Sequence, residues 1–262
     1  MQVAFGAGIF WGTPLTDATG AAIAVPTPVQ LGLLQDFSID QSFETKMLYG
    51  QNQYPQFVGR GKAKLSGKAK LAQLNGATLN SLIYGQTLAA GNVADVYDTT
   101  GIAIPATPFT VTAGATDSAT TVKIPNSGTW SVDLGVRDAN GAPMQRVAAG
   151  PIAGQYSVTA GAYLFAAADV AKVVYINYQY TSITPASAKT LTVTSLPMGY
   201  APVFRADISV PFQGKNLTII LPQCIASKFT LQSKQDDFVI PDLDFEGFAD
   251  AAGRAIYWDL SE

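Results

Sequence analysis

Residues 36–44 read DFSIDQSFE and residues 62–71 read KAKLSGKAKL, and these two stretches decide the fold. In both, apolar and polar side chains alternate with a period of two, which is typical of β-strands with one buried face. The apolar sides consist of Phe37, Ile39, Phe43, Ala63, Leu65, Ala69 and Leu71. The charged side chains of the polar sides are Asp36, Asp40, Glu44, Lys62, Lys64, Lys68 and Lys70.

The acidic row of the first stretch matches the basic row of the second in spacing. Antiparallel pairing places Asp36 opposite Lys70. It also places Glu44 opposite Lys62, so that acidic side chains face basic ones across the pair. We therefore predict that the two strands are neighbours in one sheet.

The connection between them, residues 45–61, reads TKMLYGQNQYPQFVGRG and is too long for an economical hairpin. We expect a loop, and loops of this length in compact domains usually bind a partner or are disordered. Large uncharged apolar side chains are typical of the centre of an interface, which favours binding. The predicted contact residues are Met47, Leu48, Tyr49, Gln53, Tyr54, Pro55 and Phe57.

Composition narrows the class of protein. The chain has 262 residues, of which 48% are hydrophobic and 13% are charged. Globular domains usually carry about a quarter charged residues. Two readings fit this shortfall: burial of much surface against other subunits, which we favour, or a β protein rich in Ala, Thr and Ser.

Several kinds of chemistry are excluded or disfavoured. The chain has no histidine, which removes the Ser-His-Asp triad and every imidazole metal site. The single cysteine, Cys224, excludes an internal disulfide, and we expect it to be a buried apolar residue. The net charge of −3 gives no basic footprint for nucleic acid. No signal peptide and no transmembrane helix are predicted, so we expect cytoplasmic synthesis.

The acidic run DLDFE contains Asp242, Asp244 and Glu246, which superficially resemble calcium ligands. Leu243 and Phe245 between them predict an extended strand, which places the carboxylates in a row on one face rather than around one ion. We expect a solvated or interface strand. We accordingly predict no catalytic residue, no cofactor and no metal, and therefore no enzyme.

The rest of the chain falls into three parts. Residues 72–84 carry the spacing of one helix, with Gly85 as its C-terminal cap and Gly76 as a site of close packing. Residues 98–186 form short strands, and GAYLFAAADVAKVVYINYQY (161–180) resembles the late part of an immunoglobulin-like (Ig-like) sandwich with Trp130 in its core. Further strands follow in residues 187–262, where the part made by residues 1–97 resumes.

The segments YGQNQYPQFVGRGKAKLSGKAK (49–70) and AQLNGATLNSLIYGQT (72–87) resemble the tail tube, or major tail, proteins of tailed bacteriophages. FGAGIFWGTPLTDATG (5–20) and PTPVQLGLLQDFSID (26–40) are similar to the same family. The resemblance covers roughly residues 1–95.

The resemblance implies a mainly β fold: a tail-tube-type β-barrel or sandwich with one helix, interrupted by an Ig-like sandwich on the outside of the tube. It implies a structural protein of the virion tail, assembled in the host cytoplasm as stacked homohexameric rings that conduct DNA without binding it specifically. The segment 45–61 would reach the next ring. Terminator, tape measure and distal tail proteins would be further partners, and no membrane insertion is implied.

Two alternatives stay open. The charged rows are either an ordinary exposed or interface surface, or the lining of the tube, where carboxylates would cancel the attraction of lysines for DNA. For the function, the rivals are the inner tube of a contractile secretion-type machine, which usually lacks an Ig-like insertion, and a secreted enzyme or carbohydrate-binding β-sandwich protein. The sequence shows neither an export signal nor convergent carboxylates for the latter.

Overall fold

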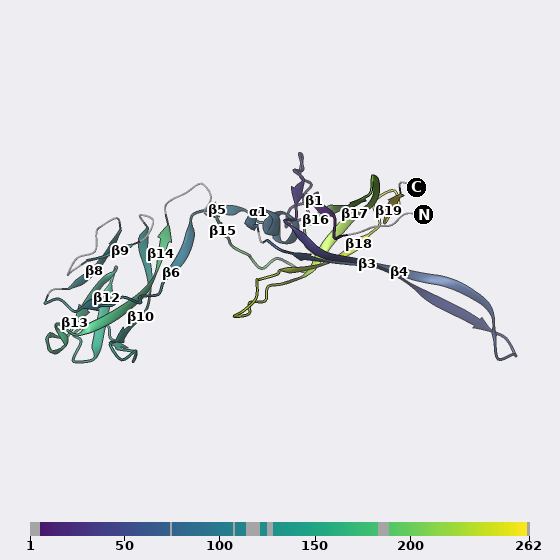
Figure 1. Ribbon diagram of the computed structural model, residues 1–262. Coiled ribbons are helices and arrows are strands. Elements are labelled where there is room, and N and C mark those ends of the chain that lie inside the picture. Colours follow the sequence, from purple (N-terminus) through teal and green to yellow (C-terminus); the bar gives the residue numbers. More distant parts are fainter. Residues whose placement is uncertain are drawn as a thin grey trace. The chain divides into compact units, whose positions relative to one another are not determined.

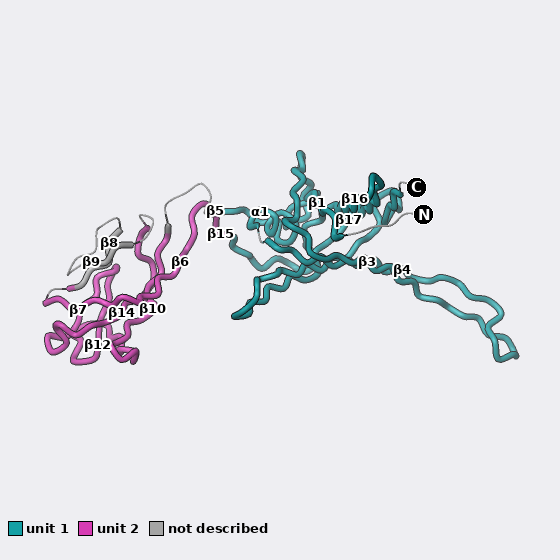
Figure 2. The backbone as a smooth tube through the Cα atoms, in the orientation of Figure 1, with its two compact units in different colours: residues 1–88, 191–262 teal, residues 89–190 magenta. Residues whose placement is uncertain are grey.

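The computed structural model describes residues 6–73, 75–106, 108–113, 121–124, 128–182 and 189–260. The chain is mainly β, as predicted, and divides into two compact units (Figures 1 and 2). Unit 1 combines Met1–Leu88 with Leu191–Glu262, and unit 2 is Ala89–Thr190. None of the sheets formed by the described strands closes on itself.

Unit 1 is built on one antiparallel sheet of eight strands. Seven of them follow one another in the order β2-β1-β16-β17-β18-β4-β3, and the eighth, β19, pairs with β17 beside β18. Their bounds are β1 Ile9–Pro14, β2 Val29–Gln30, β3 Leu34–Tyr49, β4 Pro55–Leu71, β16 Val203–Phe212, β17 Lys215–Thr230, β18 Asp242–Phe248 and β19 Tyr257–Leu260.

The sheet of unit 1 curls around its own core. Phe10 on β1 and Phe245 on β18 belong to strands three places apart, yet their ring centroids lie 5.6 Å from each other. Flat strands about 4.8 Å apart would keep these rings much farther apart, so the sheet must be strongly curved. The ring of Phe245 also covers Gly67, where a Cβ atom would come within 2.3 Å of it.

Pro222 lies inside β17, although prolines in sheets usually occur at strand ends or bulges. It is tolerated because the pairing with β16 shifts register there, between Phe204 and Ala206. Partners on the other edge of β17 also change at this point, from β19 to β18.

The helical segment of unit 1 is shorter than predicted. It consists of α1, Gly76–Leu79, continued by the π-helical turn η1, Asn80–Tyr84. It begins late because the Asn75 side chain caps it, accepting a hydrogen bond from the Ala77 N–H at 2.9 Å. Gly85 ends it with φ of 58°, as predicted. The expected close packing at Gly76 is wrong, since no atom lies within 4 Å of the place its Cβ would occupy.

Unit 2 is a β-sandwich, the architecture that an Ig-like domain requires. One sheet has the order β10-β14-β6 with β7 beside β14, and the other has the order β11-β12-β13-β8-β9. Buried side chains of both sheets, such as Tyr163 and Tyr178, pack in one core. The bounds are β6 Asn92–Val96, β7 Ile102–Ala103, β8 Phe109–Ala113, β9 Thr121–Ile124, β10 Thr129–Asp138, β11 Gln145–Arg146, β12 Gln155–Thr159, β13 Ala162–Phe165 and β14 Val173–Ser182.

The unit boundaries differ from the expected ones at residues 97 and 187. Strand β6, expected in the first part of the chain, pairs with β14 and so belongs to the sandwich. Two short strands, β5 (Leu88–Ala90) and β15 (Lys189–Leu191), pair where the chain passes between the units.

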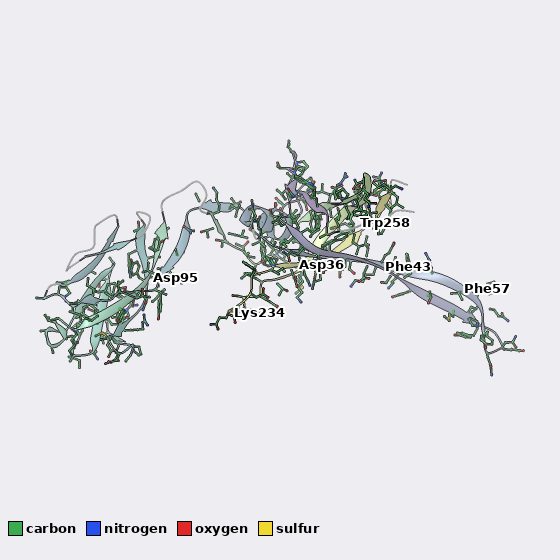
Figure 3. All side chains as sticks on the ribbon, viewed as in Figure 1. Asp36, Phe43, Phe57, Asp95, Lys234 and Trp258 are labelled. Atoms are coloured by element: carbon green, nitrogen blue, oxygen red, sulfur yellow. The ribbon has the colours of Figure 1, made fainter. Side chains whose placement is uncertain are left out.

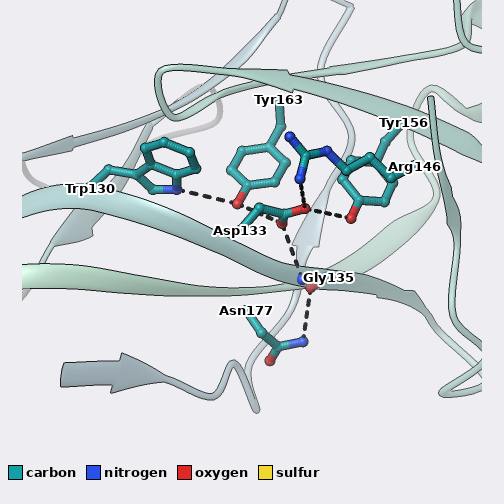
Figure 4. Close-up of polar contacts among 7 residues, drawn as sticks. All are labelled: Trp130, Asp133, Gly135, Arg146, Tyr156, Tyr163 and Asn177. Atoms are coloured by element: carbon teal, nitrogen blue, oxygen red, sulfur yellow. Dashed lines mark hydrogen bonds and ion pairs between the residues drawn. The ribbon is translucent and has the colours of Figure 1, made fainter. Parts of the chain in front are cut away.

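An aspartate with a buried side chain, Asp133, interrupts the alternation of strand β10. Register shifts on both sides of Asp133 turn its side chain inward and leave Val132 and Leu134 46% exposed. Trp130 is half-buried and packs against the core (Figure 4). Its Nε1 donates to the Tyr163 hydroxyl at 3.4 Å.

Asp133 is the centre of a polar network (Figure 4). Its carboxylate accepts hydrogen bonds from the hydroxyls of Tyr156, at 2.7 Å, and Tyr163, at 3.0 Å. Arg146 lies 3.7 Å from the same carboxylate. Burial, together with the adjacent Asp133, raises the pKa of both tyrosines, so they remain protonated donors.

Replacing Asp133 with alanine should destabilise unit 2 by about 2–4 kcal/mol, because two buried hydroxyls lose their acceptor. Urea unfolding of the full chain measures the loss. The matched control is Asp95→Ala on the exposed side of β6, which should change the free energy of unfolding by less than about 0.5 kcal/mol. Equal effects of the two substitutions would contradict a structural role for the network.

Candidate assembly surface

The polar side of β3, β4 and β18 carries the charged rows that the sequence predicted. Asp36 lies opposite Lys70 in the ladder, which confirms the predicted pairing of the strands. Leu65, Ala69 and Leu71 are buried on the other side, also as predicted. The expected pair of Glu44 and Lys62 is absent from the described register, because pairing shifts between Phe43 and Thr45.

Two of the four lysines on this surface pair with β18 rather than β3. Lys64 lies 3.1 Å from Glu246, and Lys68 lies 3.3 Å from Asp242. Lys70 is 3.8 Å from Asp36, the one ion pair among the described residues that joins the two predicted rows. The strand character of residues 242–246 was predicted and is confirmed, but its position beside β4 was not predicted.

The surface as a whole carries charges of both signs with a small excess of negative charge. Six carboxylates face four lysines: Asp36, Asp40, Glu44, Asp242, Asp244 and Glu246 against Lys62, Lys64, Lys68 and Lys70. The lysines are largely exposed, so each ion pair contributes only about 0–1 kcal/mol to stability. A shallow polar hollow of about 310 Å³ lies over Ser38, Ser66 and Asp244. The rows therefore set the charge of this surface rather than hold the sheet together.

The segment 45–61, which we expected to be a loop, is an extension of the hairpin. Over residues 55–64, β4 has no described partner other than β3. Here the two strands continue alone as a two-stranded ribbon (Figure 1). The actual turn is limited to residues 50–54. Pairing satisfies the backbone hydrogen bonds of the segment, which is why it is extended despite its uncovered side chains.

The end of the ribbon is apolar and exposed. Leu48 is 63% exposed, Phe57 is 70% exposed and Tyr54 at the turn is 82% exposed. Figure 3 shows Phe43 and Phe57 along the ribbon, with Asp36 at its base. All seven predicted contact residues lie together here: Met47, Leu48, Tyr49, Gln53, Tyr54, Pro55 and Phe57.

The outer edge of β3 is unpaired along its full 16 residues among the described strands. A two-stranded ribbon with exposed faces is marginally stable by itself, and a long free edge is a template for pairing with another chain. The ribbon thus combines exposed apolar side chains with a strand edge that has no described partner.

Cys224 is fully buried, as predicted, and burial raises the pKa of its thiol to about 12. The described residues contain no group of three or more His, Cys, Asp or Glu side chains that could hold a metal ion. Within the described ranges, no helix has the length and apolar character needed to cross a membrane.

No protein-family model matches the chain, and no curated protein matches it.

Proposed function

We propose that this chain is a structural subunit of a bacteriophage tail tube, which assembles with copies of itself into stacked rings that conduct DNA. The observation that carries the proposal is the exposed apolar ribbon of residues 45–61. Its side chains extend away from the rest of unit 1, which leaves them uncovered by the core of that unit (Figure 3).

The sheet edges support assembly into a closed ring. Pairing the free edge of β3 with a strand of the next subunit would satisfy its backbone groups and remove an edge prone to aggregation. Repeated around an axis, the same contact closes a barrel from open sheets. Six copies per ring is the number that the family resemblance implies.

The charged surface of β3, β4 and β18 fits the lining of such a tube. Lysines balanced by carboxylates give few counterion-releasing contacts with phosphates, so DNA would pass without being held. In the same proposal, unit 2 is an outward decoration, and terminator, tape measure and distal tail proteins bind the ends of the tube. The protein would be assembled in the host cytoplasm and reside in the virion tail.

Electron microscopy of the purified full chain tests the proposal. We expect rings or tubes of uniform diameter, because the ribbon and the edge of β3 are both completed by copies. Single unassociated particles at all protein concentrations would refute it.

Removing unit 2 should leave unit 1 folded and able to assemble. Deleting residues 91–188 and joining Ala90 to Lys189 through a short glycine-rich linker keeps β5 and β15, and the core of unit 1 contains no residue of the deleted part. We expect the unfolding temperature of unit 1 to change by less than about 3 °C.

The control for this deletion is the removal of residues 100–185, which leaves β6 without β14 and exposes its edge. It should aggregate where the longer deletion does not. Unfolding of both variants would show that the two units do not fold independently.

A further inference from the structure

The end of the ribbon is apolar on both faces. Residues opposite one another in an antiparallel pair point to the same face. Met47 lies opposite Val58 on one face, and Leu48 lies opposite Phe57 on the other. These four side chains are between 52% and 70% exposed. Neither face is therefore an ordinary solvated one.

The first face continues the core side of the sheet. Phe37 and Ile39 pack against the core of unit 1, and Phe43 farther along the strand is 40% exposed. Arg60 lies over the Phe43 ring at 4.3 Å, and the Tyr49 hydroxyl donates to the Met47 sulfur on the same face. The row of apolar side chains on the core side of β3 thus continues past the end of the core of unit 1.

The second face continues the charged side of the sheet and changes character at its end. Along β3 this side carries Asp36, Asp40 and Glu44. Four positions after Glu44, the residue on the same side is Leu48. Phe57 lies beside Leu48 on β4. Exposed apolar patches mark interaction sites, so the change from carboxylates to a leucine–phenylalanine pair indicates that another surface is contacted here.

One partner is too few for this ribbon. The ribbon is a single layer, and another layer packed about 10 Å away covers only the face it touches. Whatever buries Met47 and Val58 leaves Leu48 and Phe57 in water. Two separate surfaces are needed.

Unit 1 itself carries one exposed tryptophan on each side of its sheet. Trp258 on β19 lies opposite the buried Ile219, so it is on the core side, and it is 49% exposed. Trp11 on β1 lies opposite Asp207, on the other side, and is 41% exposed. The surfaces around Trp258 and Trp11 are different from the ribbon that would meet them. Each contact would therefore be heterologous and would propagate from copy to copy.

We propose that the ribbon is held between two other copies of this chain, one on the face of Met47 and Val58 and the other on the face of Leu48 and Phe57. The inference rests on the proposed self-assembly and specifies how the ribbon serves it. One subunit is then joined to two others by chemically separate contacts.

The test compares two full-length double variants that each alter one face. One is Met47→Thr with Val58→Thr, and the other is Leu48→Thr with Phe57→Thr; threonine keeps the preference for a strand. Each pair should raise the concentration needed for tube formation by about 100-fold, since two buried apolar side chains are lost. Analytical ultracentrifugation should show oligomers made through the intact face, whereas the four changes together should give monomers.

Val25→Thr is the matched control, because Val25 is 82% exposed outside the ribbon and should not affect assembly. Circular dichroism and thermal unfolding confirm that each variant is folded. If one double variant assembles like the wild type, only one face is covered: the sandwiched ribbon is then wrong, and self-assembly stands. If the wild type itself does not assemble, or both double variants assemble normally, the role of the ribbon in the proposed function also fails.

Discussion

Replacing residues 46–59 with an Asn-Gly turn should abolish tubes and rings while leaving unit 1 folded. Thr45 and Arg60 lie opposite one another, so a two-residue type I′ turn can close the shortened hairpin between them. The removed side chains are almost all exposed, which means that the core of unit 1 loses no contact. Assembly, by contrast, loses the apolar side chains at the end of the ribbon.

Electron microscopy and analytical ultracentrifugation measure the assembly, and thermal unfolding measures the fold. The unfolding temperature of unit 1 should change by less than about 3 °C. Gln51→Ser in the turn is the control, because it alters the same end of the ribbon and removes no apolar side chain. Normal tubes from the shortened chain would show that the ribbon has no part in assembly.

Replacing Phe245 with alanine should have the largest effect on stability, about 3–5 kcal/mol. The ring is 1% exposed and makes edge-to-face contacts with Phe10 and Phe204, at 5.6 and 6.1 Å between centroids. It also covers Gly67, whose missing side chain leaves room for it. Its removal leaves a cavity at the point around which the sheet curls.

Calorimetry of the full chain should therefore show a fall in the unfolding temperature of unit 1 on the order of 10 °C. The transition of unit 2 should be unchanged, since its core is separate. Phe238→Ala is the matched control, because Phe238 is 89% exposed and should cost less than about 0.5 kcal/mol. A similar loss in both variants would contradict the central position of Phe245.

The sequence predicted the strands best where one face is buried. The period of two correctly placed Leu65, Ala69 and Leu71 in the core, because a half-buried strand must alternate. Ala63 lies on the same face, as predicted, but it is exposed because this apolar stripe continues past the end of the core. The core ends near the point where β18 stops pairing with β4. Because β18 is far away in the sequence, the local pattern of β4 does not indicate this point.

The ribbon was missed for a related reason. Met47, Leu48 and Tyr49 are consecutive and apolar because both faces are uncovered by the chain itself, so alternation is lost. A register shift after Phe43 removes the remaining regularity. In unit 2, two such shifts reverse the sides of Val132 and Asp133, and bulges of this kind leave little trace in a sequence.

The candidate surface was predicted in part. All its residues on β3 and β4 were named from spacing, but the carboxylates that pair with Lys64 and Lys68 come from β18, about 180 positions later. The row of Asp242, Asp244 and Glu246 was the available signal. Its spacing matches that of the lysines, although nothing local to it identifies β4 as its neighbour.

Hydrogen exchange of the backbone amides tests most directly that copies of the chain complete the ribbon. It compares protein diluted below the concentration of assembly with assembled protein, and it uses two parts of β4. Residues 65–70 pair on both edges and should be protected in both samples. Residues 56–60 should exchange rapidly in the dilute sample and about 100-fold more slowly after assembly. Equal exchange of residues 56–60 in the two samples would contradict completion of the ribbon by other copies.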